Sequence, residues 1–311
     1  MNGRAIRIMV MGLAAAIVGS AVALSDWNHS PAQATLHHAR APKTARHAAA
    51  PFPPISVAGP AVFAPEPVVA SVGEAVVAFY GDSLGSESES LLQDALLTAG
   101  VADVRTRTFG GTAICDWFDE MRDDAVELRP SVVVVEFSGN ALTPCMMGPD
   151  GVSLLATRDV YFDKYARDAA EVLAIFSASP TRVVFVGAPI SRRAEESRDP
   201  EANRLNRMYE GLALFTPDVT YVDAGAAVLR DGHWTETLPC LPSEPCLDAD
   251  ADGVPVNIVR APDGGHFCPG APEARRGVTQ TCPVWSSGAY RFARAIADGV
   301  LVNLTRAGDR D

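Results

Sequence analysis

A serine and a histidine, each close to a carboxylate, are the residues of this chain best suited to nucleophilic catalysis. Ser83 lies in the sequence GDSL (81–84), and His266 ends the sequence DGGH (263–266). A serine hydroxyl is a poor nucleophile at neutral pH unless a base takes its proton. After residue 72 the only histidines are His233 and His266. We predict His266 as the base and Asp263 as the group that orients its imidazole, with His233 as a rival base.

The shortage of histidines argues against a metal centre. Four of the six histidines precede residue 73, which leaves too few for a multi-histidine site. The acidic run 248–253 matches the first half of a calcium loop, but its twelfth position is Val259, where an EF-hand needs a glutamate. We interpret this run as an acidic surface loop and predict neither a metal nor a cofactor.

Strand and helix patterns alternate from residue 73 to the end of the chain. Apolar, β-branched runs predict buried strands over 75–80, 131–137, 181–186 and 219–222, and a weaker strand over 103–109. Helical patterns lie between and after them, over 87–98, 117–128, 159–177, 200–215 and 288–305. The alternation predicts one three-layer α/β domain, residues 73–311, with a central parallel sheet.

Polar residues and glycines follow the predicted strands directly. Ligand sites in such sheets lie beyond the carboxyl ends of the strands. Ser83 follows the first strand, where the start of a helix favours a developing anion, although a serine at this place could also be only an N-cap. Gly110-Gly111 and Ser138-Gly139-Asn140 follow the next two strands along the chain. We expect these segments to meet at one edge of the sheet.

Taken together, these segments resemble the SGNH (GDSL) hydrolase family, in an exported bacterial form. The four sequence blocks of that family occur in order: GDSL at 81–84, FGGT at 109–112, Gly139-Asn140, and Asp263 with His266. The resemblance spans roughly residues 75–300. It implies a flavodoxin-like sheet and cleavage of acyl esters through a serine nucleophile.

The resemblance also implies an oxyanion hole. Its donors would be the backbone N–H of Ser83, the backbone N–H of a glycine of the second block, and the side-chain amide of Asn140. Gly111 fits the second role better, because Gly110 is the turn residue just off the strand. Asp82 is expected to support the serine turn.

Three classes of function are compatible with these residues. The first is an exported serine esterase acting on a small-molecule or glycan acyl ester. The second is an O-acyltransferase, because residues 110–117 are similar to the same block in SGNH domains of acyltransferases that modify bacterial surface polysaccharides. A non-catalytic binding domain is the third. The chain has 26 basic and 38 acidic residues and a net charge of −12, which makes nucleic acid an unsuitable partner. No oligomeric state is predicted.

The beginning of the chain has the pattern of an exported protein. Arg4 and Arg7 precede the uncharged stretch 8–24, so residues 1–24 are expected to be a signal peptide or an N-terminal membrane anchor. Residues 25–72 are rich in alanine and proline and read as a linker. The predicted location is secreted or extracytoplasmic, with a possible membrane tether.

Six cysteines suit an oxidising compartment. They are Cys115, Cys145, Cys240, Cys246, Cys268 and Cys282, and six cysteines allow 15 pairings. Cys240 with Cys246, and Cys268 with Cys282, would close short loops, and Cys115 and Cys145 follow predicted strands. No Cys-x-x-Cys motif is present, so zinc binding is the weaker interpretation.

Overall fold

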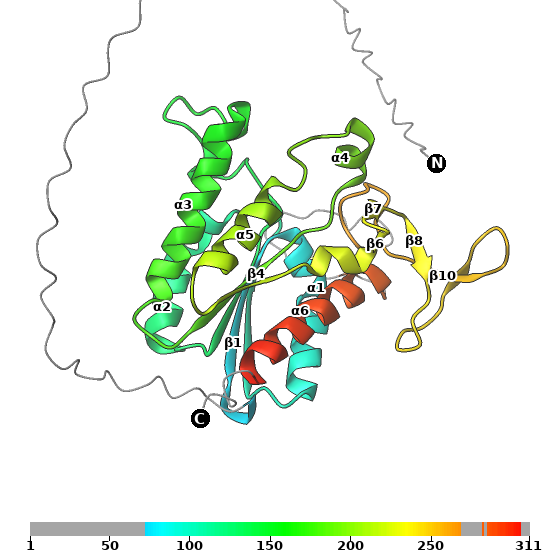
Figure 1. The fold of residues 1–311 in the computed structure, drawn as a ribbon, viewed down its shortest axis with the longest axis horizontal. Helices are drawn as coiled ribbons and strands as arrows, with labels where there is room; N and C mark the ends of the chain where they lie inside the picture. The colour runs from blue at the N-terminus through cyan, green and yellow to red at the C-terminus, as the bar shows by residue number, and fades with distance from the viewer. Residues whose placement is uncertain (1–71, 269–281, 283–284, 306–311) are drawn as a thin grey trace, which may run out of the picture. The chain divides into compact units, whose positions relative to one another are not determined.

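The four apolar runs and the weaker strand predicted over 103–109 form one parallel sheet (Figure 1). The structure is a computed structural model that describes residues 72–268, 282 and 285–305, all within the unit 62–311. The strands pair in the order β2-β1-β3-β4-β5, with every pair parallel. This is the flavodoxin-like order. The bounds are Val76–Gly81 for β1, Asp103–Thr108 for β2, Val132–Glu136 for β3, Arg182–Val186 for β4 and Val219–Val222 for β5.

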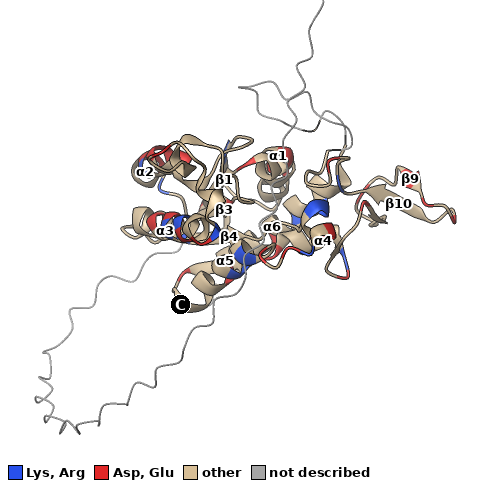
Figure 2. Cartoon of the chain, turned by 90° about the horizontal axis from the view of Figure 1, so that it is seen from above, with Lys and Arg blue, Asp and Glu red and all other residues tan. Residues whose placement is uncertain are grey.

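Helices cover both faces of the sheet, which confirms the predicted three-layer α/β fold. On one face, α1 (Ser83–Thr98) and α6 (Ser287–Thr305) pack side by side against alternate strand residues such as Phe79 and Val134. On the other face, α2 (Phe118–Glu127), α3 (Arg158–Phe176) and α5 (Arg204–Phe215) cover the remaining strand residues. Figure 2 shows the strands from above between these two groups of helices. Burial on both faces explains why the central strands are almost continuously apolar.

Helix α1 begins four residues earlier than its sequence pattern indicates. The expected start was residue 87, whereas the helix begins at Ser83. The Oδ1 atom of Asp82 accepts a hydrogen bond from the backbone N–H of Leu84 at 3.0 Å, so Asp82 is the N-cap. The alternative that Ser83 itself is only an N-cap is therefore wrong.

Several short elements were not predicted. Helix α4 (Arg192–Ser197) precedes α5, which begins at Arg204 instead of residue 200. An antiparallel pair joins β6 (Leu229–Arg230) to β7 (His233–Trp234). A small antiparallel sheet has the order β8-β10-β9, with bounds Thr237–Pro239, Pro255–Ile258 and Asp248–Ala249. The acidic run 248–253 forms β9 and the exposed turn that follows it.

Short 3-10 helices connect the main elements. They span Val72–Glu74, Ile114–Trp117, Pro144–Met146, Leu154–Ala156 and Ala224–Val228.

Three disulfides pair all six cysteines in the arrangement that their positions suggested. Cys115–Cys145 joins the segments that follow β2 and β3, Cys240–Cys246 closes a short loop, and Cys268–Cys282 lies just after His266. In the described part of the chain, no helix is both long enough and apolar enough to cross a membrane. The predicted signal peptide or anchor, and residues 25–71 of the predicted linker, lie outside the described residues.

A buried acid lies where β3 meets the start of α1. Glu136 ends β3 with no exposed surface, and its Oε2 atom is 3.3 Å from the backbone nitrogen of Asp82. Its Oε1 atom has no hydrogen-bond partner among the described residues. Burial, and next the nearby Asp82 carboxyl, raise the pKa of Glu136 well above its ordinary value.

The packing of α1 predicts a contrast between two adjacent leucines. Leu96 is fully buried in the core, whereas Leu97 is 44% exposed. Leu96→Ala should lower the free energy of unfolding by about 2–5 kcal/mol, because it leaves a cavity. Leu97→Ala should change it by less than about 1 kcal/mol. Urea unfolding with the disulfides intact measures both, and equal losses would contradict this orientation of α1.

The raised pKa of Glu136 predicts that the stability difference between Glu136→Gln and the wild type depends on pH. Above the ordinary pKa of glutamate, the unfolded chain releases the Glu136 proton while the folded protein keeps it, so stability falls as pH rises through that window. Glu136→Gln removes this loss. Its stability relative to wild type should therefore increase from pH 4 to pH 8, as measured by urea unfolding. Glu127→Gln, on the exposed end of α2, is the control and should show no such trend. A Glu136→Gln difference that does not change with pH would refute the prediction.

Candidate active site

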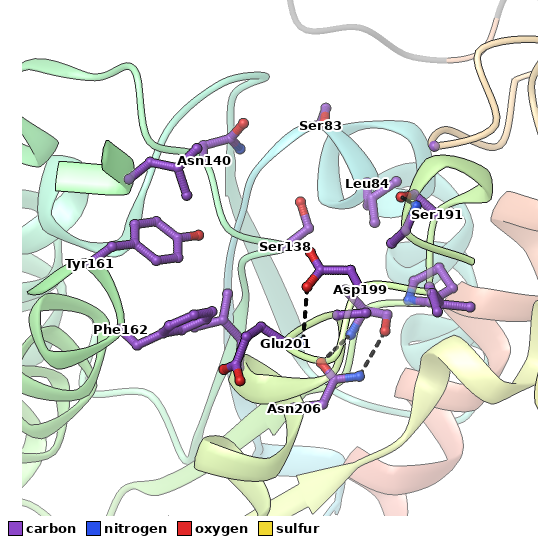
Figure 3. Close-up of a pocket in the computed structure, with 18 of the residues that line it drawn as sticks. Ser83, Leu84, Ser138, Asn140, Tyr161, Phe162, Ser191, Asp199, Glu201 and Asn206 are labelled. Atoms are coloured by element: carbon purple, nitrogen blue, oxygen red, sulfur yellow. Dashed lines mark hydrogen bonds between the residues drawn. The ribbon is translucent and has the colours of Figure 1, made fainter. Parts of the chain in front are cut away.

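The ends of β1 and β3 contribute to one pocket at the carboxyl edge of the sheet. The pocket has a volume of about 350 Å³, and Ser83, Asn140 and His266 are among the residues that line it. In Figure 3, Ser83 and Asn140 lie toward one end of the pocket, and Phe162, Glu201 and Asn206 lie toward the other. The segments after β1 and β3 therefore meet at this edge, as expected, and the segment after β2 joins them through the bond from Asn140 to the carbonyl oxygen of Thr112.

Ser83, His266 and Asp263 form a continuous hydrogen-bonded chain. The Oγ atom of Ser83 is 2.9 Å from Nε2 of His266, and Nδ1 of His266 is 2.6 Å from Oδ2 of Asp263. The other oxygen of Asp263 accepts hydrogen bonds from the backbone N–H groups of Gly265 and His266. Partial burial raises the pKa of Asp263, but these two backbone bonds and the His266 side chain outweigh it and lower the pKa to about 2. The carboxylate beside the imidazole is thus ionised at neutral pH.

The loop that carries Asp263 and His266 is held from inside by a buried arginine. Arg260 is 1% exposed, and its Nη2 atom donates to the carbonyl oxygens of Gly265 at 2.8 Å and Gly264 at 3.3 Å. Burial lowers the pKa of Arg260 to about 10, so it keeps its charge at neutral pH. This residue was not predicted from the sequence. Its only signal was a lone arginine in an otherwise apolar stretch just before the DGGH sequence.

Helix α4 and strand β7 hold the same loop from outside. The carbonyl oxygen of Gly264 accepts hydrogen bonds from the backbone N–H of Arg192 at 2.9 Å and from Nε1 of Trp234 at 3.0 Å. Gly264 has a φ of +76°, and a Cβ atom there would lie 2.6 Å from the Cβ of Arg192. A glycine is therefore required at this turn.

Asp82 connects the serine turn with the segment after β3. Its Oδ2 atom accepts hydrogen bonds from the backbone N–H of Ser138 at 2.8 Å, from the Ser138 hydroxyl at 2.6 Å and from Nδ2 of Asn140 at 2.9 Å. Burial raises the pKa of Asp82, and the bonds from Ser138 lower it in part. The expected supporting role of Asp82 matches these contacts.

The three predicted oxyanion donors differ in their surroundings. The backbone N–H of Ser83 lies at the start of α1 and has no partner among the described residues. The Nδ2 atom of Asn140 donates both to Asp82 and, at 3.0 Å, to the carbonyl oxygen of Thr112. Gly111 adopts a φ of +86° in the turn next to Thr112 but does not line the pocket.

The opposite wall of the pocket was not predicted from the sequence. It is formed by residues of α3 and of the segment before and within α5, including Tyr161, Phe162 and Leu205. Arg158 and Asp199 also line it and form a two-bonded ion pair, with distances of 3.1 and 2.8 Å. These residues belong to no sequence motif, and only the packing of the folded chain brings them to the site.

His233, the rival base, lies elsewhere. Its side chain is 74% exposed, and its Nδ1 atom is 2.8 Å from Oε1 of Glu195 on α4. It does not line the pocket. This placement favours His266 over His233 as the base.

The serine turn also fits a second sequence pattern, Gly-x-Ser-x-Gly, because Gly85 follows Leu84. That pattern is typical of the serine turn of α/β-hydrolases, so the motif alone does not distinguish the two kinds of enzyme. Here both glycines have a local cause. A Cβ atom on Gly81 or Gly85 would lie 3.0 or 2.9 Å from Oε2 of the buried Glu136.

Comparisons with solved structures returned several acyl-ester-cleaving enzymes at low identity. A GDSL-like lipase from Bacteroides thetaiotaomicron is 13% identical, with 77% of this chain and 92% of that chain covered and a TM-score of 0.44. A lipase/acylhydrolase from Enterococcus faecalis is 11% identical, with 73% and 95% covered and a TM-score of 0.45. An acetylxylan esterase from Geobacillus stearothermophilus is 16% identical, with 51% and 80% covered and a TM-score of 0.40.

Comparison with curated proteins gave no match. Among protein families, the one described as "Protein of unknown function (DUF459)" matches residues 76–271, which is more than half of the chain and includes all four sequence blocks. The chain therefore belongs to the DUF459 family.

Proposed function

We propose that this protein is a serine esterase that hydrolyses acyl esters, with Ser83 as nucleophile, His266 as base and Asp263 as the residue that orients the base. The observation that carries the proposal is the hydrogen-bonded chain from Ser83 through His266 to Asp263, which opens into the pocket. Nucleophile, base and orienting group are each within hydrogen-bond reach, as this chemistry requires.

The reaction proceeds in two halves. In the first, Nε2 of His266 takes the Ser83 proton while Oγ attacks the ester carbonyl carbon, and the ionised Asp263 stabilises the imidazolium. The tetrahedral intermediate collapses, the imidazolium gives its proton to the departing alcohol, and an acyl-enzyme remains. In the second half, His266 activates a water molecule, which releases the carboxylic acid and restores Ser83.

The negative oxygen of the intermediate needs hydrogen-bond donors. The backbone N–H of Ser83, which has no partner in the described part of the chain, supports a first donor, and the start of α1 adds a favourable dipole. Asn140 would become a donor by exchanging its bond to the Thr112 carbonyl for one to the oxyanion. The neighbouring Gly111 is proposed as the third. Removal of one such donor typically lowers kcat by a factor of about 10²–10³.

We also propose that the enzyme works outside the cytoplasm on a small-molecule or glycan acyl ester. Three disulfides support an oxidising compartment. An acyltransferase would form the same acyl-enzyme and pass the acyl group to a sugar hydroxyl, so the assay needs both water and glycan acceptors.

Ser83→Ala should abolish release of p-nitrophenol from p-nitrophenyl acyl esters, because it removes the hydroxyl that His266 contacts and on which the acyl-enzyme would form. The matched control is Ser90→Ala, an exposed serine on the same helix, which should retain wild-type activity. Circular dichroism checks that both variants fold. A Ser83→Ala protein with most of its activity would rule out the nucleophile. If a glycan acceptor speeds the turnover of the ester and acylated glycan is the product, the protein is an acyltransferase.

His266→Ala should lower kcat nearly as far as Ser83→Ala does, because members of one catalytic unit fail together. Asp263→Ala should lower kcat less than His266→Ala does, since an imidazole that is not oriented still takes the Ser83 proton occasionally. His233→Ala is the control and should keep its kcat. The Asp263 pKa of about 2 keeps that carboxylate charged down to acidic pH, so a loss of wild-type rate between pH 7 and pH 4 should not come from its protonation. An inactive His233→Ala protein beside an active His266→Ala protein would overturn the assignment.

A further inference from the structure

Helix α1 carries a buried acidic residue, Glu87, that the mechanism above does not use. Glu87 is four residues after Ser83, so the two side chains lie on the same face of the helix, one turn apart. The Glu87 side chain lies inside the protein, with 2% of the residue exposed. A carboxyl group at such a position calls for an explanation, because an apolar side chain would fill the space at lower cost.

The contacts of Glu87 lead to the loop of the base. Its Oε2 atom accepts a hydrogen bond from the backbone N–H of Phe267 at 2.6 Å, and Phe267 directly follows His266. Phe267 is itself fully buried and packs against Phe292 of α6, with ring centroids 5.0 Å apart. Without Glu87, the Phe267 N–H would be a buried donor with no partner in this structure.

Glu87 supplies a connection that the other supports of the loop do not. Arg260, Arg192 and Trp234 hold the carbonyl oxygens of this loop, and none of them belongs to α1. The helix of the nucleophile and the loop of the base thus meet through the Ser83–His266 bond and the Glu87–Phe267 bond. The Cys268–Cys282 disulfide lies beside the same carboxylate, with both sulfurs within 4.8 Å of it.

We infer that Glu87 is a positioning residue whose carboxylate oxygen fixes the Phe267 backbone and thereby holds Nε2 of His266 in hydrogen-bond reach of Ser83. This inference rests on the proposed esterase function. What matters is an acceptor atom at the right distance from the helix and not the negative charge. The other carboxylate oxygen has no partner among the described residues, and burial raises the pKa of Glu87. Both observations agree with a role that does not need a charge.

Three variants of Glu87 distinguish the effect of the position of the acceptor oxygen from the effect of the negative charge. Glu87→Gln keeps an oxygen at the same distance and should retain kcat within about threefold. Glu87→Asp keeps the charge but is one methylene shorter, and Glu87→Met has no acceptor. Both should lower kcat on the order of 10²-fold with KM nearly unchanged, because a small misplacement of the base slows proton transfer. Glu89→Gln and Glu89→Met are the matched controls, since Glu89 lies on α1 but bonds Thr108, and both should keep wild-type kcat.

Hydrogen exchange of the Phe267 amide gives a readout that does not depend on activity. The amide should be protected in the wild type and in Glu87→Gln, and should exchange faster in Glu87→Asp and Glu87→Met. The fraction of folded protein, from near-ultraviolet circular dichroism, corrects each kcat for misfolding. If Glu87→Met does not fold, Glu87→Asp and Glu87→Gln still decide the question.

Opposite outcomes identify which idea has failed. If Glu87→Asp keeps full kcat while Glu87→Gln loses it, charge and not position matters, and the inference is wrong. Full kcat in both Glu87→Asp and Glu87→Met, with an inactive Ser83→Ala, also overturns it and leaves the esterase intact. Activity that survives Ser83→Ala would instead remove the proposed function, and the inference with it.

Discussion

The geometry of the site depends on the hydrogen bonds that the buried carboxylate of Asp82 accepts. One of its oxygens caps α1 through Leu84, and the other gathers Ser138 and Asn140 from the end of the neighbouring strand. A single side chain therefore sets both the direction in which the nucleophile helix starts and the place of the segment after β3. Because the residue has no exposed surface, water cannot substitute for these partners, and the two turns are fixed relative to each other.

Acids surround the start of α1 on its inner side. Asp82, Glu136 and Glu87 are all buried there, and burial raises the pKa of each of them. A helix start offers free N–H groups and a favourable dipole, and both Asp82 and Glu136 accept hydrogen bonds from the first N–H groups of α1, whereas Glu87 accepts one from Phe267. Their packing also explains the sequence, since Gly81 and Gly85 leave the space that the Glu136 carboxyl occupies. The glycines of the serine turn are thus required by the acid behind them.

The sheet could be predicted from sequence because its central strands β1, β3 and β4 are buried on both faces and form almost continuous apolar runs. The start of α1 could not be, since Ser83, Gly85 and Ser86 are poor helix formers and the helix begins there only because Asp82 caps it and the core covers it. The chain Ser83–His266–Asp263 could be predicted because Ser83 lies in a short motif at the end of β1, and Asp263 and His266 lie in another short motif. Arg260 and Glu87 were not, because charged residues are normally expected at the surface and only tertiary packing shows them to be inside.

The long separation between the two halves of the site bears on how the protein is made. Ser83 and His266 are 183 residues apart in sequence, and α6, which packs beside α1, comes later still. A chain is synthesised from its N-terminus at roughly 5–20 residues per second, so the segment with the serine exists for many seconds before the segment with the imidazole. During that interval the serine has no base to contact. A protein that ends before residue 266 would contain the residues of all five strands and yet lack the contact on which its proposed chemistry depends.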